Sequence, residues 1–265
     1  MNRGGLPGQL RSMLKNLLRG WEGKTGIAFK DLVTGDEFLH NPDHVFPAAS
    51  VIKIAILLEL FRQAEKEDLD LNEQIELKPE NKVGGCGVLF DMSPGLVLTL
   101  KDLAVLMIEI SDNTASNMLI DRLGMRKINR LLRSHGLFKS GIHRRFMVRP
   151  NTKISKNFIT PREIMILLDK LYRREILSGY YTDTALEILS RQQYREKLPR
   201  FLPPEIKVAH KPGEITGVSH DAGIVLLPGH PYILCVFVEG VKSMFQGDEL
   251  IGNISLMVYQ YIVEE

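Results

Sequence analysis

The sequence lacks most of what a metal site, a disulfide framework or a membrane span would need. It has only two cysteines, Cys86 and Cys235, among 265 residues, and no histidine and cysteine residues have the spacing of metal ligands. No apolar run approaches the ~20 residues of a spanning helix. A formal net charge of +2 is too small to indicate a nucleic-acid or membrane surface. We therefore expect no metal, no cofactor, no nucleic-acid partner and no membrane span.

Acidic residues are absent from one long internal stretch. Between Asp121 and Glu163 the chain has neither aspartate nor glutamate, while arginine and lysine recur. These basic residues include Arg130, Arg133, Lys139, Arg144, Arg145, Arg149, Lys153 and Lys156. The absence excludes a carboxylate base from this region, and Glu163 itself has the position of a helix cap. We consider His143 as a residue of this stretch that could act as a base near neutral pH. The alternative is that it is an ordinary surface histidine.

The remaining composition is that of a globular protein. Hydrophobic residues make up 44% of the chain and charged residues 25%, which suits one substantial domain or two intimate halves. The first residues predict an amphipathic helix, whose apolar face carries Leu10, Met13, Leu14, Leu17, Leu18 and Trp21. They have neither the apolar core nor the cleavage site of a signal peptide. We expect either a cytoplasmic protein or an exported domain whose signal has been removed.

Strand patterns occupy the two ends of the chain, and helical patterns fill the middle. The predicted strands are 25–32, 37–40, 206–210, 220–227 and 232–238. We expect an α/β (α+β) fold in which 1–47 and 203–265 form an antiparallel five-stranded sheet flanked by terminal helices. Residues 48–202 would form an all-helical lobe. The whole chain, 1–265, is predicted to be a single domain with its ligand cleft between the lobes.

The stretch Ser50-Val51-Ile52-Lys53 is placed where a short loop meets an apolar helix. On a helix, positions i and i+3 share a face, so the Ser50 hydroxyl and the Lys53 amine are expected to be neighbours. A partly desolvated lysine in a first helical turn can lose its proton and act as a base for a serine. The alternative is ordinary, because serine is a common N-cap and lysine a common helix residue. The buried character of the helix favours the catalytic interpretation.

Two further polar motifs follow along the chain. Ser111-Asp112-Asn113 separates two predicted helices, where a simple connector with an N-cap is the alternative. Lys211-Pro212-Gly213 follows a predicted strand near the end of the chain. Cys86 lies in a glycine-rich stretch, where we favour a small loop residue over a reactive thiol.

With these three motifs in this order, the sequence resembles the penicillin-recognising serine hydrolases, most closely the class A β-lactamases. The resemblance rests on residues 46–53 for S-x-x-K, residues 111–117 for S-D-N and residues 210–213 for K-T-G. It covers nearly the whole chain. It implies the β-lactamase and transpeptidase fold, and a reaction through a covalent acyl-enzyme.

The resemblance assigns a role to each motif residue. Ser50 would be the acylated nucleophile, Lys53 its base or proton relay, and Ser111 the donor to the leaving nitrogen. Asn113 would contact the substrate amide, while Asp112 would hold the loop in shape. Lys211 and Gly213 would lie at the substrate, Lys211 supplying positive potential. The N–H groups of Ser50 and Glu214 would form the oxyanion hole.

Two departures from the family pattern modify this expectation. Class A enzymes hydrolyse the acyl-enzyme with a glutamate from an E-x-x-L-N motif, which falls in the acid-free stretch here. Pro212 replaces the threonine or serine that offers a hydroxyl to the β-lactam carboxylate, and it removes a strand N–H, which predicts an altered register. Glu214 brings a negative charge towards the site, which the Arg144–Arg145 pair would offset unless those arginines are merely solvated.

The function expected from the resemblance is a serine hydrolase with weak or slow β-lactam hydrolysis. One alternative is a D,D-peptidase-like amidase or esterase acting on a peptide or other acyl substrate. The other is a β-lactam-binding sensor that is acylated but does not turn over. In each case the partner would be a small molecule or a peptide, and we expect a monomer.

Overall fold

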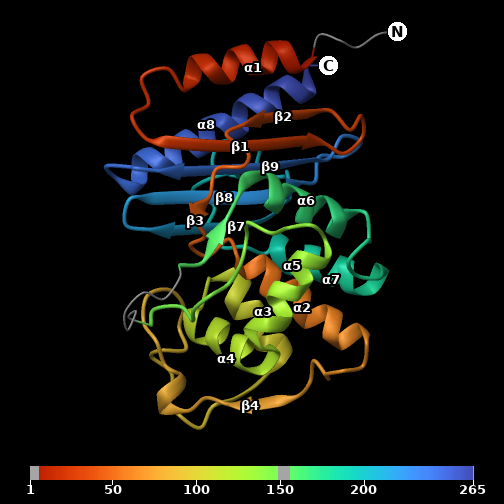
Figure 1. Ribbon diagram of the computed structural model, residues 1–265, viewed down its shortest axis with the longest axis vertical. Helices are drawn as coiled ribbons and strands as arrows, with labels where there is room; N and C mark the ends of the chain where they lie inside the picture. The colour runs from red at the N-terminus through yellow and green to blue at the C-terminus, as the bar shows by residue number, and fades with distance from the viewer. Residues whose placement is uncertain (1–5, 149–155, 265) are drawn as a thin grey trace. The chain divides into compact units, whose positions relative to one another are not determined.

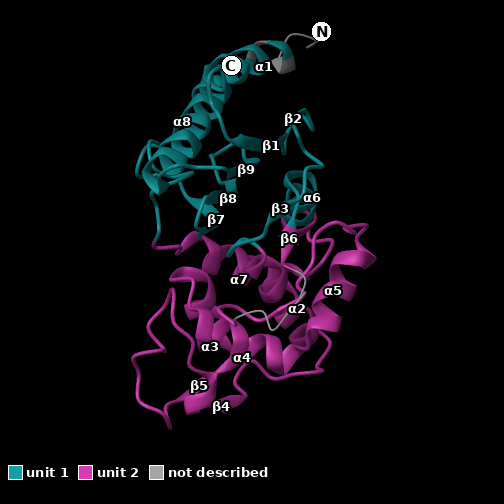
Figure 2. Ribbon diagram, turned by 60° about the vertical axis from the view of Figure 1, so that its left-hand side comes forward, with its two compact units in different colours: residues 1–51, 159–169, 194–265 teal, residues 52–158, 170–193 magenta. Residues whose placement is uncertain are grey.

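The computed structural model describes residues 6–148 and 156–264 and divides into two compact units (Figures 1 and 2). Unit 1 comprises residues 1–51, 159–169 and 194–265, and unit 2 comprises residues 52–158 and 170–193. The segment 159–169, which lies within the stretch expected to be helical, therefore belongs with the sheet in unit 1. The acid-free stretch is described except for residues 149–155, where Arg149 and Lys153 lie outside the described residues.

The described part of unit 1 contains the expected five-stranded antiparallel sheet, with the strand order β2-β1-β9-β8-β7. Its strands are β1 (Lys24–Asp31), β2 (Glu37–His40), β7 (Val208–Ile215), β8 (Val218–Val225) and β9 (Tyr232–Glu239). The first strand thus pairs with the last one, as the predicted meeting of the chain ends requires. The fold class predicted from the sequence is confirmed.

The terminal helices α1 (Leu6–Leu17) and α8 (Met244–Val263) cover one face of this sheet (Figure 1). A single apolar core joins them to the strands. Its members include Leu10 and Leu14 from α1, Ile27 and Phe29 from β1, Val236 and Val238 from β9, and Ile251, Ile254 and Val258 from α8. Leu17, Leu18 and Trp21 pack at its border. The amphipathic face predicted for the first residues is the face that contacts this core.

On the opposite face of β1, Gly26 has no side chain, and the reason is steric. Strand residues alternate between faces, so Gly26 points away from the core that contains Ile27. A Cβ atom on Gly26 would lie 2.7 Å from the Phe46 ring and 2.7 Å from Pro161. Glycine at this position allows the loop before Ser50 and the start of α6 (Pro161–Tyr172) to pack directly against the sheet.

Unit 2 is mainly helical. Its helices are α2 (Lys53–Glu65), α3 (Leu100–Glu109), α4 (Asn113–Leu123), α5 (Met125–Ser134) and α7 (Gly179–Ser190), with a short 3₁₀ turn, η1 (Pro79–Asn81). Strands β4 (Gln74–Glu76) and β5 (Val97–Thr99) form a two-stranded sheet in unit 2, whereas β3 (Phe46–Pro47), a strand of unit 1, pairs with β6 (Phe158–Ile159).

Helix α2 is the central element of unit 2. Helices α3, α4, α5 and α7 all contact it, and every residue from Lys53 to Phe61 is buried. A helix that is apolar on all sides is stable only when it is surrounded. The sequence-based prediction of a buried central helix is confirmed, although the helix begins at Lys53 and not at Ser50.

Side-chain caps begin α3 and α6, and the second involves Glu163, whose position indicated a helix cap. Thr99 accepts a hydrogen bond from the Asp102 N–H, and the Asp102 carboxylate accepts one from the Thr99 N–H, which completes a capping box for α3. The Thr160 hydroxyl accepts a hydrogen bond from the Glu163 N–H at the start of α6. Among the helices of the described residues, none is long and apolar enough to cross a membrane.

His220 on β8 connects the sheet to the loop before Ser50. Its Nε2 donates to the Pro47 carbonyl at 2.9 Å, and its Nδ1 accepts from the Val238 N–H at 3.1 Å. Its ring also lies against those of Phe46 and Phe237. Complete burial lowers the pKa of His220 to about 4, and the nearby carbonyls oppose this only in part.

We predict that His220 makes the folded chain acid-sensitive. Between pH 6.5 and pH 4 the unfolded chain binds a proton that folded His220 does not, so the free energy of unfolding falls as the pH falls. The loss reaches about 3 kcal/mol below pH 4. Urea unfolding at several pH values should show a flatter dependence for His220→Gln in this window. The exposed His143 is the control: His143→Gln should retain the original slope, and equal slopes for all three chains would contradict the prediction.

Candidate active site

Ser50 lies in a turn that immediately precedes α2. The Val51 N–H donates to the Ala48 carbonyl at 3.2 Å, and α2 begins three residues after the serine. Lys53 therefore lies in the first turn of α2, as expected, whereas Ser50 precedes the helix, because Ile52 is the N-cap residue. Ala49 has a φ of 43°, which is uncommon for a residue other than glycine. Strain of this kind often accompanies functional sites.

Ser50 is partly exposed, whereas Val51, Ile52 and Lys53 are buried. Its hydroxyl belongs to the one residue of the S-x-x-K stretch that solvent reaches. A nucleophile must be reachable in this way, while the buried residues after it hold the turn in place. The expected order of roles along the stretch is compatible with this burial pattern.

Gly213 on β7 packs directly against the backbone of this turn. A Cβ atom at Gly213 would lie 2.7 Å from the Ser50 nitrogen and 3.0 Å from the Val51 nitrogen. Such distances are too short for any side chain, so only glycine permits this approach. The structure therefore brings the Ser50 nitrogen beside Gly213, the residue that precedes Glu214. Ser50 and Glu214 are the residues whose N–H groups were expected to form an oxyanion hole.

Lys211 and Pro212 lie on the same strand. The Lys211 side chain is fully buried, and its Nζ donates to the Pro212 carbonyl at 3.0 Å. The register of β7 with β8 runs without interruption from Val208 to Ile215, so the expected change of register at Pro212 is wrong. The physical reason is that β7 is an edge strand, where a residue without an N–H is tolerated.

The Glu214 carboxylate forms an ion pair on the face of β7 opposite to Lys211 and Gly213. Alternation along β7 places the Glu214 side chain on the other face of the strand, where its carboxylate accepts a hydrogen bond from Lys197 at 3.0 Å. Lys197 also lies 3.1 Å from Asp248 on α8. Burial lowers the pKa of Lys197, but the Asp248 and Glu214 carboxylates outweigh it, and the pKa is raised. The negative charge of Glu214, which was expected to face the site, is instead paired with Lys197.

Lys53, Ser111 and Asn113 meet in unit 2. The Lys53 Nζ donates to the Ser111 carbonyl at 2.7 Å, to the Ser111 Oγ at 3.1 Å and to the Asn113 Oδ1 at 2.9 Å. All three residues are buried. Ser111 has a φ of 58°, and this conformation lets its carbonyl and its hydroxyl approach the same ammonium group. The first two motifs thus contribute to one polar cluster.

Asp112 organises the chain around this cluster. It caps α4 by accepting a hydrogen bond from the Ala115 N–H at 2.8 Å. Its other oxygen accepts from the Val88 and Leu89 N–H groups at 2.7 and 2.9 Å. The Asn113 N–H donates to the carbonyl of the exposed Cys86 at 3.0 Å. The glycine-rich loop is therefore bound to the Ser111-Asp112-Asn113 segment by the Asp112 carboxylate and by the Asn113 N–H.

Phe146, in the acid-free stretch, is the residue that the sequence analysis missed. Its ring centroid lies 4.6 Å from the Lys53 Nζ. Asn117 on α4 binds its backbone on both sides, accepting from the Phe146 N–H at 2.8 Å and donating to its carbonyl at 3.0 Å. Asn117 ends the quoted S-D-N segment, but no sequence signal connects it with Phe146, because the contact is formed across 29 residues.

The other residues considered in this stretch have ordinary surroundings. His143 is exposed, and its backbone N–H donates to the Asn157 side chain. Arg145 forms an ion pair with Asp121 at 3.0 Å. Of the adjacent Arg144 and Arg145, the second therefore already has an acidic partner in unit 2.

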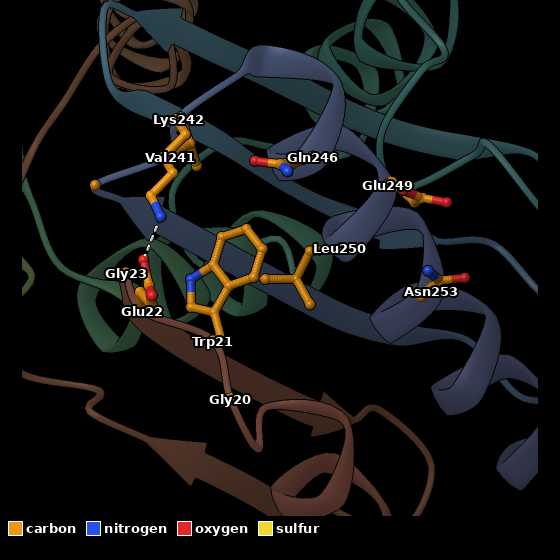
Figure 3. A pocket seen from close by; sticks show the side chains of 11 residues that line it. Gly20, Trp21, Glu22, Gly23, Val241, Lys242, Gln246, Glu249, Leu250 and Asn253 are labelled. Atoms are coloured by element: carbon orange, nitrogen blue, oxygen red, sulfur yellow. Dashed lines mark ion pairs between the residues drawn. The ribbon is translucent and has the colours of Figure 1, made fainter.

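A cavity of about 330 Å³ in unit 1 is separate from all of these residues (Figure 3). Trp21 forms one wall, Gln246 and Leu250 from α8 form another, and the Glu22–Lys242 ion pair lies at its edge. None of the residues predicted from the three motifs lines this cavity. The hydroxyl, amine and amide groups described above are therefore the better candidate for chemistry.

Comparison with known proteins places this arrangement in context. A family model described as "Beta-lactamase enzyme family" matches residues 9–262. A β-lactamase from Bacteroides uniformis is 29% identical, over 95% of this chain and 90% of the relative. A crystal structure of a β-lactamase from Sphaerobacter thermophilus has a TM-score of 0.91 and 30% identity, covering 97% of both chains. The structure of PBP-A has a TM-score of 0.89 and 33% identity, covering 99% of this chain and 97% of that one.

We predict that Gly213→Ala disrupts the turn that carries Ser50. The added methyl group would meet backbone nitrogen atoms and not a flexible side-chain end, so the turn or the strand must move. Acylation of Ser50 by a fluorescent penicillin, followed by intact mass, should slow about 100-fold or more, which is the usual effect of losing an oxyanion donor.

Gly8→Ala on α1 is the matched control. Nothing lies within 4 Å of a Cβ atom at Gly8, and alanine favours a helix over glycine by about 1 kcal/mol. This variant should acylate at the original rate and melt at an equal or higher temperature. Unchanged acylation of Gly213→Ala would show that the close approach has no role in the reaction.

Proposed function

This chain belongs to the β-lactamase enzyme family and is a β-lactamase-like serine hydrolase, and from that premise we propose that Ser50 is its nucleophile. The observation that carries the proposal is the buried cluster in which the Lys53 Nζ binds the Ser111 Oγ and the Asn113 Oδ1. Lys53 follows Ser50 by three residues. A serine followed three residues later by an amine that has a second hydroxyl in reach suits acyl transfer.

The proposed reaction begins with the transfer of the Ser50 proton to the neutral form of Lys53. The Ser50 Oγ then bonds to the substrate carbonyl carbon, and the carbon–nitrogen bond breaks. The proton passes from Lys53 to the leaving nitrogen through the Ser111 hydroxyl, so that no charge is left on that nitrogen. The 3.1 Å hydrogen bond between Lys53 and Ser111 supports this route.

The oxyanion that forms during the attack would bind the N–H groups of Ser50 and Glu214. Support comes from the contact of Gly213 with the Ser50 backbone, which brings the two chain segments together within unit 1. Backbone N–H groups that are already in place stabilise developing charge without reorganisation. The pairing of Glu214 with Lys197 removes the repulsion that its carboxylate would otherwise add.

Substrate binding would use Asn113 for a side-chain amide and Lys211 for a carboxylate. Pro212 offers no hydroxyl to that carboxylate, so we propose weaker binding of anionic β-lactams than the family motif would provide. We propose that the protein acts as a monomer and a single domain on a small molecule.

The acyl-enzyme is proposed to hydrolyse slowly. The stretch from 122 to 162 has no carboxylate to activate water, and Phe146 from this stretch lies over Lys53. A leucine-to-glutamate variant of PBP-A, 33% identical to this chain, has been solved as an acyl-enzyme complex with penicillin G. That a related fold forms such an adduct supports acylation of this chain by penicillin.

We predict that Ser50→Ala abolishes covalent labelling by penicillin. The intact mass of the unsubstituted chain should increase by one penicillin, and that of the variant should not change. Lys53→Ala should still fold but acylate at least 100-fold more slowly, because general-base assistance contributes about 10²–10⁴-fold. Full labelling of Ser50→Ala would exclude this residue as the nucleophile.

We predict a rapid burst followed by slow turnover with a chromogenic cephalosporin. The burst should equal one product per chain, and its adduct should persist in the mass spectrum because no carboxylate base is available. Continuous turnover without a burst would contradict slow deacylation. Turnover of a p-nitrophenyl ester alone would identify an esterase or peptidase-like enzyme, and an adduct that never decays would identify a sensor.

A further inference from the structure

The contact between Phe146 and Lys53 has no role in the acylation step described so far. Lys53 is completely buried, and the face of the Phe146 ring lies 4.6 Å from its Nζ. Once Lys53 has taken the Ser50 proton it is a cation, and at this distance a cation is attracted to the negative face of an aromatic ring, more strongly when it is desolvated. The ring therefore acts on the same amine that binds Ser111 and Asn113.

The backbone of Phe146 is fixed by two hydrogen bonds to the Asn117 side chain. Asn117 accepts from the Phe146 N–H and donates to its carbonyl, at 2.8 and 3.0 Å. Its own side chain is fully buried on α4, the helix that begins with Asn113. One helix thus carries an oxygen that binds the Lys53 Nζ and the amide that holds Phe146 over it.

We propose that Phe146 is a positioning residue that holds the Lys53 amine within hydrogen-bond reach of Ser111. A lysine side chain has four flexible carbons and a compact charge, so its direction depends on the groups around its tip. Ser111 and Asn113 bind it through hydrogen bonds, and the ring restricts the remaining directions. The inference rests on the proposed function, because Lys53 must act on Ser50 for its direction to affect acylation.

The test compares Phe146→Leu with Phe146→Tyr. Leucine retains the apolar character but removes the aromatic face, whereas tyrosine restores it. With fluorescent penicillin under stopped flow, Phe146→Leu should reduce the acylation rate constant about five- to tenfold with the same dissociation constant. Phe146→Tyr should recover the rate to within about twofold. A merely structural role would change melting and binding together.

A spectroscopic signal checks the contact independently of activity. In a chain with ¹³C-labelled lysine, the ring current of Phe146 should displace the resonance of the Lys53 ε-methylene. The displacement should disappear in Phe146→Leu and remain in Phe146→Tyr. If all three chains have the same resonance, the contact does not exist and the proposal is overturned.

Phe138 provides the matched control in the same stretch, because its side chain is 74% exposed. Phe138→Leu should leave both the acylation rate and the Lys53 resonance unchanged. Normal acylation of Phe146→Leu, or equal losses in both leucine variants, would overturn the positioning role while leaving the proposed function intact. If the unsubstituted chain is not acylated, the proposed function fails and the inference fails with it.

Discussion

The hydrogen bonds of a buried lysine are the interaction on which the candidate site depends. Removing an ammonium group from water is costly unless acceptors replace its hydration. Lys53 obtains acceptors from Ser111 and Asn113, and Ser111 adopts a left-handed backbone conformation to provide two of them. Asp112 then caps α4 and binds the adjoining loop. The shape of this segment follows from the need to solvate one amine.

A second constraint acts on the serine, and it is steric. The turn that carries Ser50 contacts β7 at Gly213, where no side chain fits. His220 binds the preceding Pro47 carbonyl from the neighbouring strand. The backbone of the turn is therefore supported by the sheet of unit 1. In the proposed reaction this support orients Ser50 before substrate arrives, which avoids an ordering cost.

The acid-free stretch acquires a structural meaning once Phe146 is placed. A sequence comparison with the class A pattern describes it only by what is missing, a glutamate base. The structure shows an aromatic ring over Lys53 and a buried asparagine that holds it. Aromatic and carboxylate groups both attract a lysine, but only the carboxylate can accept a proton from water. This difference is the physical basis of the slow deacylation proposed above.

Local patterns in the sequence determined the sheet strands, the buried α2 helix, the cap at Glu163 and the three motifs, because periodicity and caps depend on neighbours along the chain. The exact start of α2 and the direction of the Glu214 carboxylate were decided by tertiary packing. So were the unbroken register at Pro212, which depends on β7 being an edge strand, and the Phe146–Lys53 contact. These features join residues that are distant in sequence, and no periodic signal records which distant side chains will meet.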